Sequence, residues 1–555
     1  MERASRRPPQ GAAGRTAAEL PERTRPAETR ETPSPTEEMR PLDGRASVQR
    51  RRPRLPTAAW VCFTVALLNG IVWGLIIPLF QTPDEPGHVA YVQHVAETGK
   101  PPTGRSGASH FSDEQRSLLD ALLWKQIQRR KDNRVPGTAT YRKNLERDVD
   151  ALADRVSGGG YTTDTNNPPL YYYGAAAIYD LSPWSALPDR VHVLRLFSAL
   201  LAAVTVLFVF LFVRELLPST PWAWTVGALA VAFQPMFGFT SSGVTSETVL
   251  YAASAGIFYL FALAFRRGLT LNRGAAIGAL AAIGLLSKTN MLGLAPGIGL
   301  GLLVLVLTAD RDHRRQAIRG ALAALVVVAV PAVIYMALNS TVWDRGLWFG
   351  SEGVPPVKDI PVPGSGSGAA SGAASGAATE TESATLLDGI SYMWQFYLPR
   401  LPFMHSYFPD YQLRNLWFDG FIGEFGWLEF GFPQWVYNWS LALALGLLAL
   451  AARQLILLRN VLRSRLWELI TYLGLMLGVL VLIAGTGYVA RLGGTPTYEQ
   501  PRYLFPLLAL YGALIALAAR GVGKRYGPAV GVFLVCIAIA HTAAAMLLTL
   551  TRYYG

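Results

Sequence analysis

Cysteine and charge are both scarce in this chain of 555 residues. The two cysteines, Cys62 and Cys536, lie inside apolar runs near opposite ends of the sequence. Their spacing indicates no metal site, and we expect no structural disulfide between them. Charged residues make up 16% of the chain and hydrophobic residues 51%, whereas soluble proteins carry about 25% charged residues. This balance excludes an ordinary soluble domain and indicates many membrane spans.

Because Met1 leads into a polar segment, we expect no cleavable signal peptide at the start. Residues 1–54 carry almost no large apolar side chains, so we expect a disordered tail. A basic cluster at residues 45–54 precedes the first apolar run and predicts that the tail is cytoplasmic. The net charge of +12 lies largely in this tail and in short basic loops, which marks membrane topology and speaks against a nucleic-acid partner.

Long apolar runs predict an all-α polytopic membrane protein with about 11 transmembrane helices. The first run covers residues 56–80, and the long run around Lys288 exceeds one span, so we divide it at residues 287–290. Basic connecting segments alternate with polar ones, in agreement with a cytoplasmic N-terminus. The further predicted spans are residues 191–213, 221–239, 247–266, 274–287, 289–308, 317–338, 437–458, 466–484, 502–520 and 527–550.

Two long polar segments separate the spans. We expect an N-terminal transmembrane module at residues 55–338, with a first outer loop at 81–190 that carries surface-lying helices. A second outer loop at 339–436 contains a flexible Gly, Ala and Ser tether at 364–384. It also contains an aromatic-rich stretch, which is typical of a membrane interface or of contact with an amphiphilic ligand. C-terminal transmembrane helices follow at 437–555.

The exit of the first span carries two adjacent carboxylates and a nearby histidine, Asp84, Glu85 and His88. Charged groups at the membrane boundary are costly and therefore indicate a functional site. A structural interpretation is also open, since Asp84 is a suitable N-cap for a short amphipathic helix on the membrane surface that ends at Gly99. Capping accounts for one acid only, whereas Glu85 and His88 remain unexplained by it.

Four short motifs follow one another along the chain: PDEPGH at 83–88, NPPLYY at 167–172, FGW at 425–427 and QPRYL at 500–504. Their order resembles the bacterial membrane-protein family called domain of unknown function 2142, over residues 60–526 without the tether. The carboxylates after the first span and the long first loop also resemble the GT-C superfamily of membrane glycosyltransferases. That superfamily includes the protein O-mannosyltransferases and the lipid A aminoarabinose transferases.

The chain departs from the family pattern at two places. Ser246-Glu247 stands where relatives often carry Asn or Asp-containing motifs, which leaves the role of Glu247 open. Gln500 stands before Pro501 and Arg502 where a glycine is expected. Proline restricts the backbone at this turn, but the positive charge is kept.

The resemblance implies a GT-C-like bundle that transfers a sugar from a polyprenyl-phosphate donor to an envelope glycan or protein acceptor at the outer face, with inversion at the anomeric carbon. An inverting displacement needs a carboxylate that takes the acceptor proton, and Asp84 is our first choice for this base. Glu85 could share or orient that role, and His88 could hydrogen-bond either acid. One histidine beside two acids is a poor metal signature, so no metal or other cofactor is required, although a divalent ion is compatible with the chemistry.

The leaving phosphate gains negative charge, which cations near the outer boundary must neutralise. We expect Arg502, Lys288 and Arg195 to bind the donor phosphate, in that order of preference. Arg195 could instead pair with Asp189 and serve only the structure. These residues, together with membrane lipid, complete the predicted surroundings of the donor.

Two other functions are compatible with parts of this pattern. A transporter or flippase for lipid-linked oligosaccharides would also place charges within the membrane, but we see no inverted repeat of broken helices. An O-antigen-type polymerase or ligase would also use a polyprenyl donor at the outer face. We would then expect the main outer loop late in the chain and no acidic motif after the first span.

Overall fold

A computed structural model describes residues 55–103, 110–148, 155–156, 158–160, 165–183, 186–343, 345, 386–408, 413–492 and 500–555. These residues form helices almost throughout, and their one sheet is a short antiparallel hairpin of β1 (Glu424–Phe425) and β2 (Phe430–Gly431). The predicted all-α class is therefore confirmed. The predicted tail at 1–54 and the tether at 364–384 lie outside the described residues.

Nine helices within the described part of the chain are long and apolar enough to cross a membrane, and two shorter apolar helices, α9 (Pro221–Ala232) and α12 (Leu271–Leu285), accompany them. Nine of the about 11 predicted spans are therefore found as long apolar helices in this part of the chain, and the shorter α9 and α12 occupy the places of the other two. The nine are α1 (Thr57–Ile76), α8 (Leu187–Leu216), α11 (Glu247–Arg267), η3 with α13 (Thr289–Leu307), α14 (Arg311–Thr341), α17 (Gln434–Leu457), α19 (Leu466–Leu492), η6 with α20 (Pro501–Gly521) and α21 (Gly527–Tyr554).

Two of the predicted spans have instructive boundaries. The run around Lys288 does divide into α12 and a second helix, which begins as η3 (Thr289–Leu294) and continues as α13 (Ala295–Leu307). The predicted span at 221–239 is not one helix, because α9 ends before Pro235 and a short α10 (Pro235–Ser241) follows. Proline lacks the N–H that a continuous helix would need at this position.

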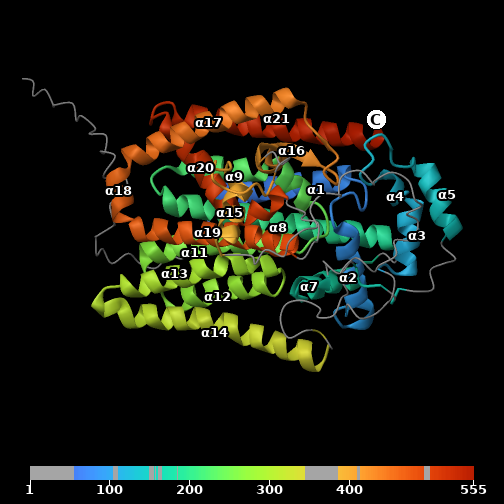
Figure 1. The fold of residues 1–555 in the computed structure, drawn as a ribbon, viewed down its shortest axis with the longest axis horizontal. Coiled ribbons are helices and arrows are strands. Elements are labelled where there is room, and N and C mark those ends of the chain that lie inside the picture. The colour runs from blue at the N-terminus through green and yellow to red at the C-terminus, as the bar shows by residue number, and fades with distance from the viewer. Residues whose placement is uncertain are drawn as a thin grey trace, which may run out of the picture.

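The helices of the first loop gather at one end of the bundle, while α18 (Arg459–Ser464) marks the opposite end (Figure 1). We call the first of these the site end, because Asp84 directly precedes α2 there. Arginines are frequent in the connections at the opposite end, where α8 and α11 finish and α14 begins. The loop helices are α2 (Glu85–Thr98), α3 (Asp113–Ala121), α4 (Trp124–Ile127), α5 (Thr138–Asp148) and α7 (Leu170–Leu181).

Helix α2 is buried within the protein, so its prediction as a helix on the membrane surface is wrong. Its first nine residues are all buried, and it packs against α7. The first loop folds over it, since the side chain of Gln115 donates to the carbonyl of Pro86 at 2.7 Å. Gly160 approaches α2 so closely that a Cβ atom there would lie 2.5 Å from the carbonyl oxygen of Gly87. The polar first loop thus covers α2, whose amphipathic pattern predicted contact with lipid.

The second long loop returns to the bundle through α15 (Leu386–Tyr397), η5 (Arg414–Asp419), α16 (Gly420–Gly423) and the β1–β2 hairpin. Its aromatic side chains have mixed surroundings. Tyr392, Phe396 and Phe425 are completely buried, whereas Phe403 is exposed. The ring of Phe425 stacks on Trp73 of α1, with 6.0 Å between centroids. Part of the aromatic stretch therefore builds the core and holds the hairpin on the site end.

Candidate functional site

The turn between α1 and α2 has an unusual backbone. Phe80 and Asp84 adopt left-handed conformations, with φ of 67° and 64°. Such conformations cost non-glycine residues about 1 to 3 kcal/mol, and they concentrate at functional sites. Asp84 occupies the N-cap position of α2, but its side chain makes no capping hydrogen bond. The carboxylate of Asp84 is therefore directed to another partner.

Arg195 of α8 is fully occupied within the protein. Its Nε and Nη2 groups donate to the two carboxylate oxygens of Glu85 at 2.7 and 2.6 Å. Further bonds run from its Nη1 to the carbonyls of Gly74 and Ile77, and from its Nη2 to the carbonyl of Pro78. These bonds use all five N–H groups of the guanidinium. Arg195 therefore ties α8 to the last turn of α1 and to the start of α2.

Glu85 is equally occupied. Besides Arg195, it accepts the backbone N–H of Phe80 at 2.8 Å and that of Val244 at 3.1 Å, and it has no accessible surface. The alternative expectation that Arg195 pairs with Asp189 is wrong, because the guanidinium turns to Glu85 instead. We call this arrangement the closed pair. Both groups have their hydrogen-bonding capacity filled, so neither is placed to bind a phosphate or to accept a proton.

Four charged side chains from separate elements form a second cluster, which we call the charge tetrad: Asp84, Glu247, Lys288 and Arg502. Arg502 Nη2 contacts the carboxylate of Asp84. Its Nε lies 3.7 Å from Glu247 Oε1, and Lys288 Nζ lies 3.8 Å from the same oxygen. Tyr251 donates to the other oxygen of Glu247 at 2.8 Å. The structure thus unites Asp84 with the two cations ranked first for the donor phosphate.

The tetrad, unlike the closed pair, keeps hydrogen-bonding groups that have no partner among the described residues. The side chain of Asp84 is 40% accessible. Nε of Arg502 is buried and makes no hydrogen bond. The surrounding protein atoms favour the neutral form of Asp84, but the charge of Arg502 and its hydrogen bond outweigh them and hold the pKa of Asp84 below its ordinary value. Asp84 is therefore an ionised carboxylate at neutral pH.

His88 lies beside the tetrad as a neutral group. Its Nδ1 is 2.7 Å from the hydroxyl of Tyr172, and its Nε2 is 3.4 Å from the hydroxyl of Thr245. Burial, followed by the charge of Lys288, lowers the pKa of His88 to about 3. A histidine of this kind has one ring N–H and no positive charge between pH 5 and 8. It can orient hydroxyl groups but does not act as a cationic acid at neutral pH.

A small cavity adjoins Arg502, with a volume of about 10 Å³. It is lined by Pro83 of the α1–α2 turn, by Thr240 of α10, and by Glu424 and Leu428 of the hairpin. This volume is close to that of a single water-sized probe, so it holds no sugar.

Three polar residues of this region were not selected from the sequence as site residues. Glu247 was noted only as a departure from the family pattern, although an acid at the start of an apolar run is itself a functional signal. Tyr251, one helical turn later, carries no such signal. Glu424 lies outside any charged motif, and burial together with the negative charge of Asp419 raises its pKa. Only the folded chain places Glu424 against the cavity.

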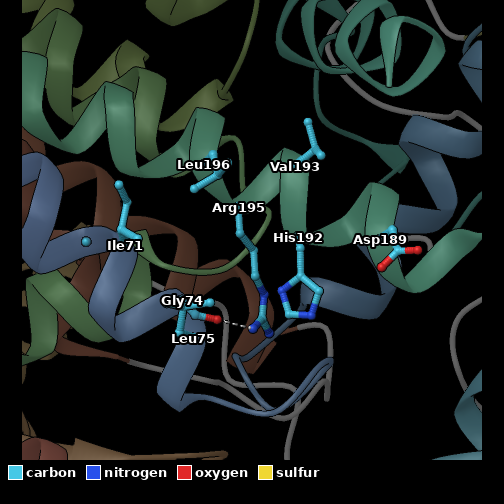
Figure 2. Close-up of a pocket in the computed structure, with 9 residues that line it drawn as sticks. Ile71, Gly74, Leu75, Asp189, His192, Val193, Arg195 and Leu196 are labelled. Atoms are coloured by element: carbon cyan, nitrogen blue, oxygen red, sulfur yellow. Dashed lines mark hydrogen bonds between the residues drawn. The ribbon is translucent and has the colours of Figure 1, made fainter. Parts of the chain in front are cut away.

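A larger cavity of about 220 Å³ lies between α1 and α8, on the other side of the closed pair. Figure 2 shows Arg195 and His192 projecting from α8, with Arg195 bonded to Gly74 of α1. Asp189 also lines the cavity, and the remaining lining is mainly apolar. The cavity contacts the closed pair and includes no member of the tetrad. Since Arg195 has no N–H to spare, this cavity offers no obvious phosphate site.

The described residues contain no group of three or more His, Cys, Asp or Glu side chains that could hold a metal ion. Asp84 and Glu247 are the carboxylates of the tetrad, and each already has a cationic neighbour. The expectation that no metal is required stays a prediction.

A family model described as "Predicted membrane protein (DUF2142)" matches residues 67–511. The chain belongs to the DUF2142 family. This agrees with the resemblance carried by the four sequence motifs, all of which fall within the matched residues. No curated protein matches this DUF2142 protein.

Two solved structures of an oligosaccharyltransferase from Archaeoglobus fulgidus are similar to the DUF2142 protein. The apo form has 14% identity and a TM-score of 0.44, covering 89% of this chain and 56% of the archaeal one. The form tethered to an acceptor peptide through a disulfide has 13% identity and a TM-score of 0.38, with coverage of 89% and 54%. This chain thus spans little more than half the length of the archaeal enzyme.

Proposed function

We propose that this DUF2142 protein is an integral membrane glycosyltransferase, which transfers a sugar from a polyprenyl-phosphate donor to an acceptor hydroxyl with inversion. The observation that carries the proposal is the charge tetrad, in which an accessible carboxylate, Asp84, touches a buried arginine, Arg502, at one end of an apolar bundle. A base and a phosphate-binding cation in contact are what such a transfer needs.

Asp84 is the proposed base. It takes the proton of the acceptor hydroxyl while the oxygen attacks the anomeric carbon. The bond between that carbon and the phosphate oxygen breaks. The leaving group is polyprenyl phosphate, a monoester. A carboxylate paired with arginine is a weak base, but a phosphate that engages Arg502 would relieve this pairing and raise the pKa of Asp84. Donor binding would then activate the base.

Arg502 and Lys288 are the proposed phosphate ligands. The buried Nε of Arg502 is available to an oxygen, and the guanidinium offers a planar fork that matches phosphate geometry. Lys288 supplies a second charge from the α12–η3 turn. Glu247 separates the two cations, at 3.7 Å from Arg502 and 3.8 Å from Lys288, and so sets their spacing. The negative charge that develops on the leaving group would be met from two sides.

The closed pair takes a different part in this proposal from the one expected from sequence. Glu85 and Arg195 fix the turn that presents Asp84, and neither meets the substrate. His88 remains neutral and orients the hydroxyl groups of Tyr172 and Thr245 beneath that turn. The proposal thus keeps Asp84, Arg502 and Lys288 in the reaction.

The proposed location of the reaction is the outer face of the cell membrane, with an envelope glycan or protein as acceptor. Arginines cluster at the end of the bundle opposite to the site, and positive residues are enriched on the cytoplasmic side of membrane proteins. A label that reacts with a single cysteine placed at Lys100, accessible from outside intact cells, would support this orientation. Labelling of that cysteine only after lysis would contradict it.

The decisive experiment measures sugar transfer by the purified protein in lipid nanodiscs. A lipid-linked sugar profile of cells lacking the gene identifies the accumulating donor, which is then radiolabelled and supplied with envelope acceptors. We expect Asp84→Asn to lower turnover about 10²- to 10⁴-fold, the usual contribution of a general base.

Asp189→Asn is the matched control, because Asp189 is an exposed acid at the same end of the bundle with no place in the tetrad. We expect this variant to transfer sugar like the wild type. Equal turnover by both variants would remove Asp84 as the base. Absence of transfer from any polyprenyl-linked donor would remove the proposed function.

A further inference from the structure

A second cavity, of about 160 Å³, runs between α12, α13 and α14 and is lined almost entirely by apolar side chains. These three helices lie side by side along one edge of the bundle (Figure 1). The lining extends on α13 and η3 from Met291, near the site end, to Leu302. At 1.5 to 2 Å per residue this is roughly 15 to 20 Å, about half the thickness of a hydrocarbon core. We call it the apolar groove.

Lys288 stands at the site end of the apolar groove. It lies in the turn between Leu285 and Met291, both of which line the groove. The backbone N–H of Met291 donates to the carbonyl of Lys288 at 3.1 Å, which ties Lys288 to the first lining residue of η3. The ammonium group reaches Glu247 at 3.8 Å and thereby joins the charge tetrad. The turn that connects two lining segments of the apolar groove thus also supplies a cation to the charge tetrad.

Small residues are frequent in the lining of the groove. Gly278, Ala281, Ala295 and Gly299 line it, while longer aliphatic side chains form its walls. A Cβ atom added to Gly299 would meet nothing within 4 Å, so open space lies above this position. At Gly278, in contrast, a Cβ atom would lie 2.4 Å from the carbonyl oxygen of Ala324, so α12 and α14 pack closely there and the open part of the groove lies beside α13.

We propose that the apolar groove holds the isoprenoid chain of a polyprenyl phosphate, with its phosphate at Lys288 and Arg502. This inference rests on the proposed function for the choice of an isoprenoid over an ordinary acyl chain. Its independent support is the union of a membrane-embedded apolar groove with a cationic end. The groove assigns α12, α13 and α14 to donor binding.

The test uses the full chain in nanodiscs and a long-chain polyprenyl phosphate that carries a photoactivatable group midway along its chain. We expect cross-links in peptides of α12 and α13. Gly299→Phe should fill the groove and lower the cross-linking yield about tenfold, since its ring would occupy the space that the buried part of the isoprenoid chain needs. Gly299→Ala should stay near the wild type, because one methyl group leaves most of the space free.

Gly446→Phe in α17 is the matched control. Gly446 is also an exposed glycine of a membrane-spanning helix with open space at its Cβ position, and it lies away from the groove. We expect wild-type labelling from this variant. Unchanged labelling in Gly299→Phe, or cross-links confined to other helices, would overturn the groove assignment. Equal displacement of the probe by phosphatidylglycerol and by unlabelled polyprenyl phosphate would also overturn it, since the groove would then be a general lipid site.

The same variants separate this inference from the proposed function. Labelling of the groove that Gly299→Phe abolishes would support the binding site even if no sugar transfer were detected. A second outcome is that Gly299→Phe and wild type transfer sugar equally well from a long-chain donor and from a geranyl-phosphate donor. That result would support the transferase and contradict the groove as the isoprenoid site. We expect Gly299→Phe to raise KM for the long-chain donor and to leave KM for the geranyl donor unchanged.

Discussion

Two neighbouring carboxylates in this protein have opposite surroundings. Glu85 has no accessible surface, four hydrogen bonds and a guanidinium whose donors are all used. Asp84, one residue earlier, is 40% accessible and shares Arg502 with a second acid. Both belong to ion pairs at the same end of the bundle. The two ion pairs differ in how many hydrogen-bond donors and acceptors remain unused in the folded protein.

This contrast shows how an ion pair can be assigned to structure or to chemistry. A buried pair with every donor and acceptor satisfied can only hold its elements together, and breaking it exposes an uncompensated charge. A pair with an accessible carboxylate and an unused N–H can exchange partners when a substrate arrives. The following predictions separate the closed pair from the charge tetrad.

Arg502→Met should have the largest effect. It removes the guanidinium that we assign to the leaving phosphate, and we expect turnover to fall about 10³-fold, as when one preorganised donor to a developing anion is lost. Steady-state transfer in nanodiscs measures the change. Arg214→Met, at the opposite end of the bundle, is the control and should remain active. Turnover within a few-fold of wild type in Arg502→Met would move the phosphate site elsewhere.

Glu85→Gln should act on stability. It leaves Arg195 charged and buried without its counterion, which costs about 3 to 5 kcal/mol in comparable buried pairs. Thermal unfolding in detergent should show a much lower midpoint, while Asp84→Asn should unfold close to the wild type because its carboxylate is accessible. An unchanged midpoint for Glu85→Gln would mean that the closed pair does not hold α1, α2 and α8 together.

Lys288→Met should have an intermediate effect on donor binding. Lys288 is 3.8 Å from Glu247 and acts as a point charge rather than a fork, so we expect KM for the donor to rise about tenfold, or 1.4 kcal/mol. Turnover at saturating donor should fall less than in Arg502→Met. A variant with normal KM and strongly reduced turnover would place Lys288 in the chemical step instead.

His88 should have the smallest effect at neutral pH, because its contribution appears only in the pH dependence of stability. Its pKa is about 3 in the folded protein and near 6.5 when unfolded, so the unfolded chain binds the extra proton between these values. Stability from His88 is complete above pH 6.5 and is lost as the pH falls, by at most about 1.4 kcal/mol per pH unit. His88→Gln should flatten the unfolding midpoint between pH 6.5 and 5 relative to wild type. Identical pH profiles would show that His88 is not held neutral.

The sequence allowed most of the helices to be predicted, because lipid demands long apolar runs with satisfied backbones. The division at Lys288 followed from length alone. The break at Pro235 and the burial of α2 did not, since both depend on segments far away in sequence. Sequence reasoning also selected Asp84, Arg502 and Lys288 as site residues, which the fold brings together, because charges at span ends are rare. Sequence reasoning could not assign different roles to Asp84 and Glu85. Their surroundings differ because Arg195 and the backbone of Val244 bind only Glu85 of the two acids.

The spacing of the two ion pairs along the chain bears on how the protein is made. Arg195 follows Glu85 by 110 residues, so the closed pair is available as soon as α8 has been inserted. Arg502 follows Asp84 by 418 residues, after most of the bundle has entered the membrane. In a chain that ends between α8 and η6, the closed pair would therefore fix the α1–α2 turn, but Asp84 would lack the positive charge of Arg502. The charge tetrad can therefore form only after η6 has been made, much later than the closed pair.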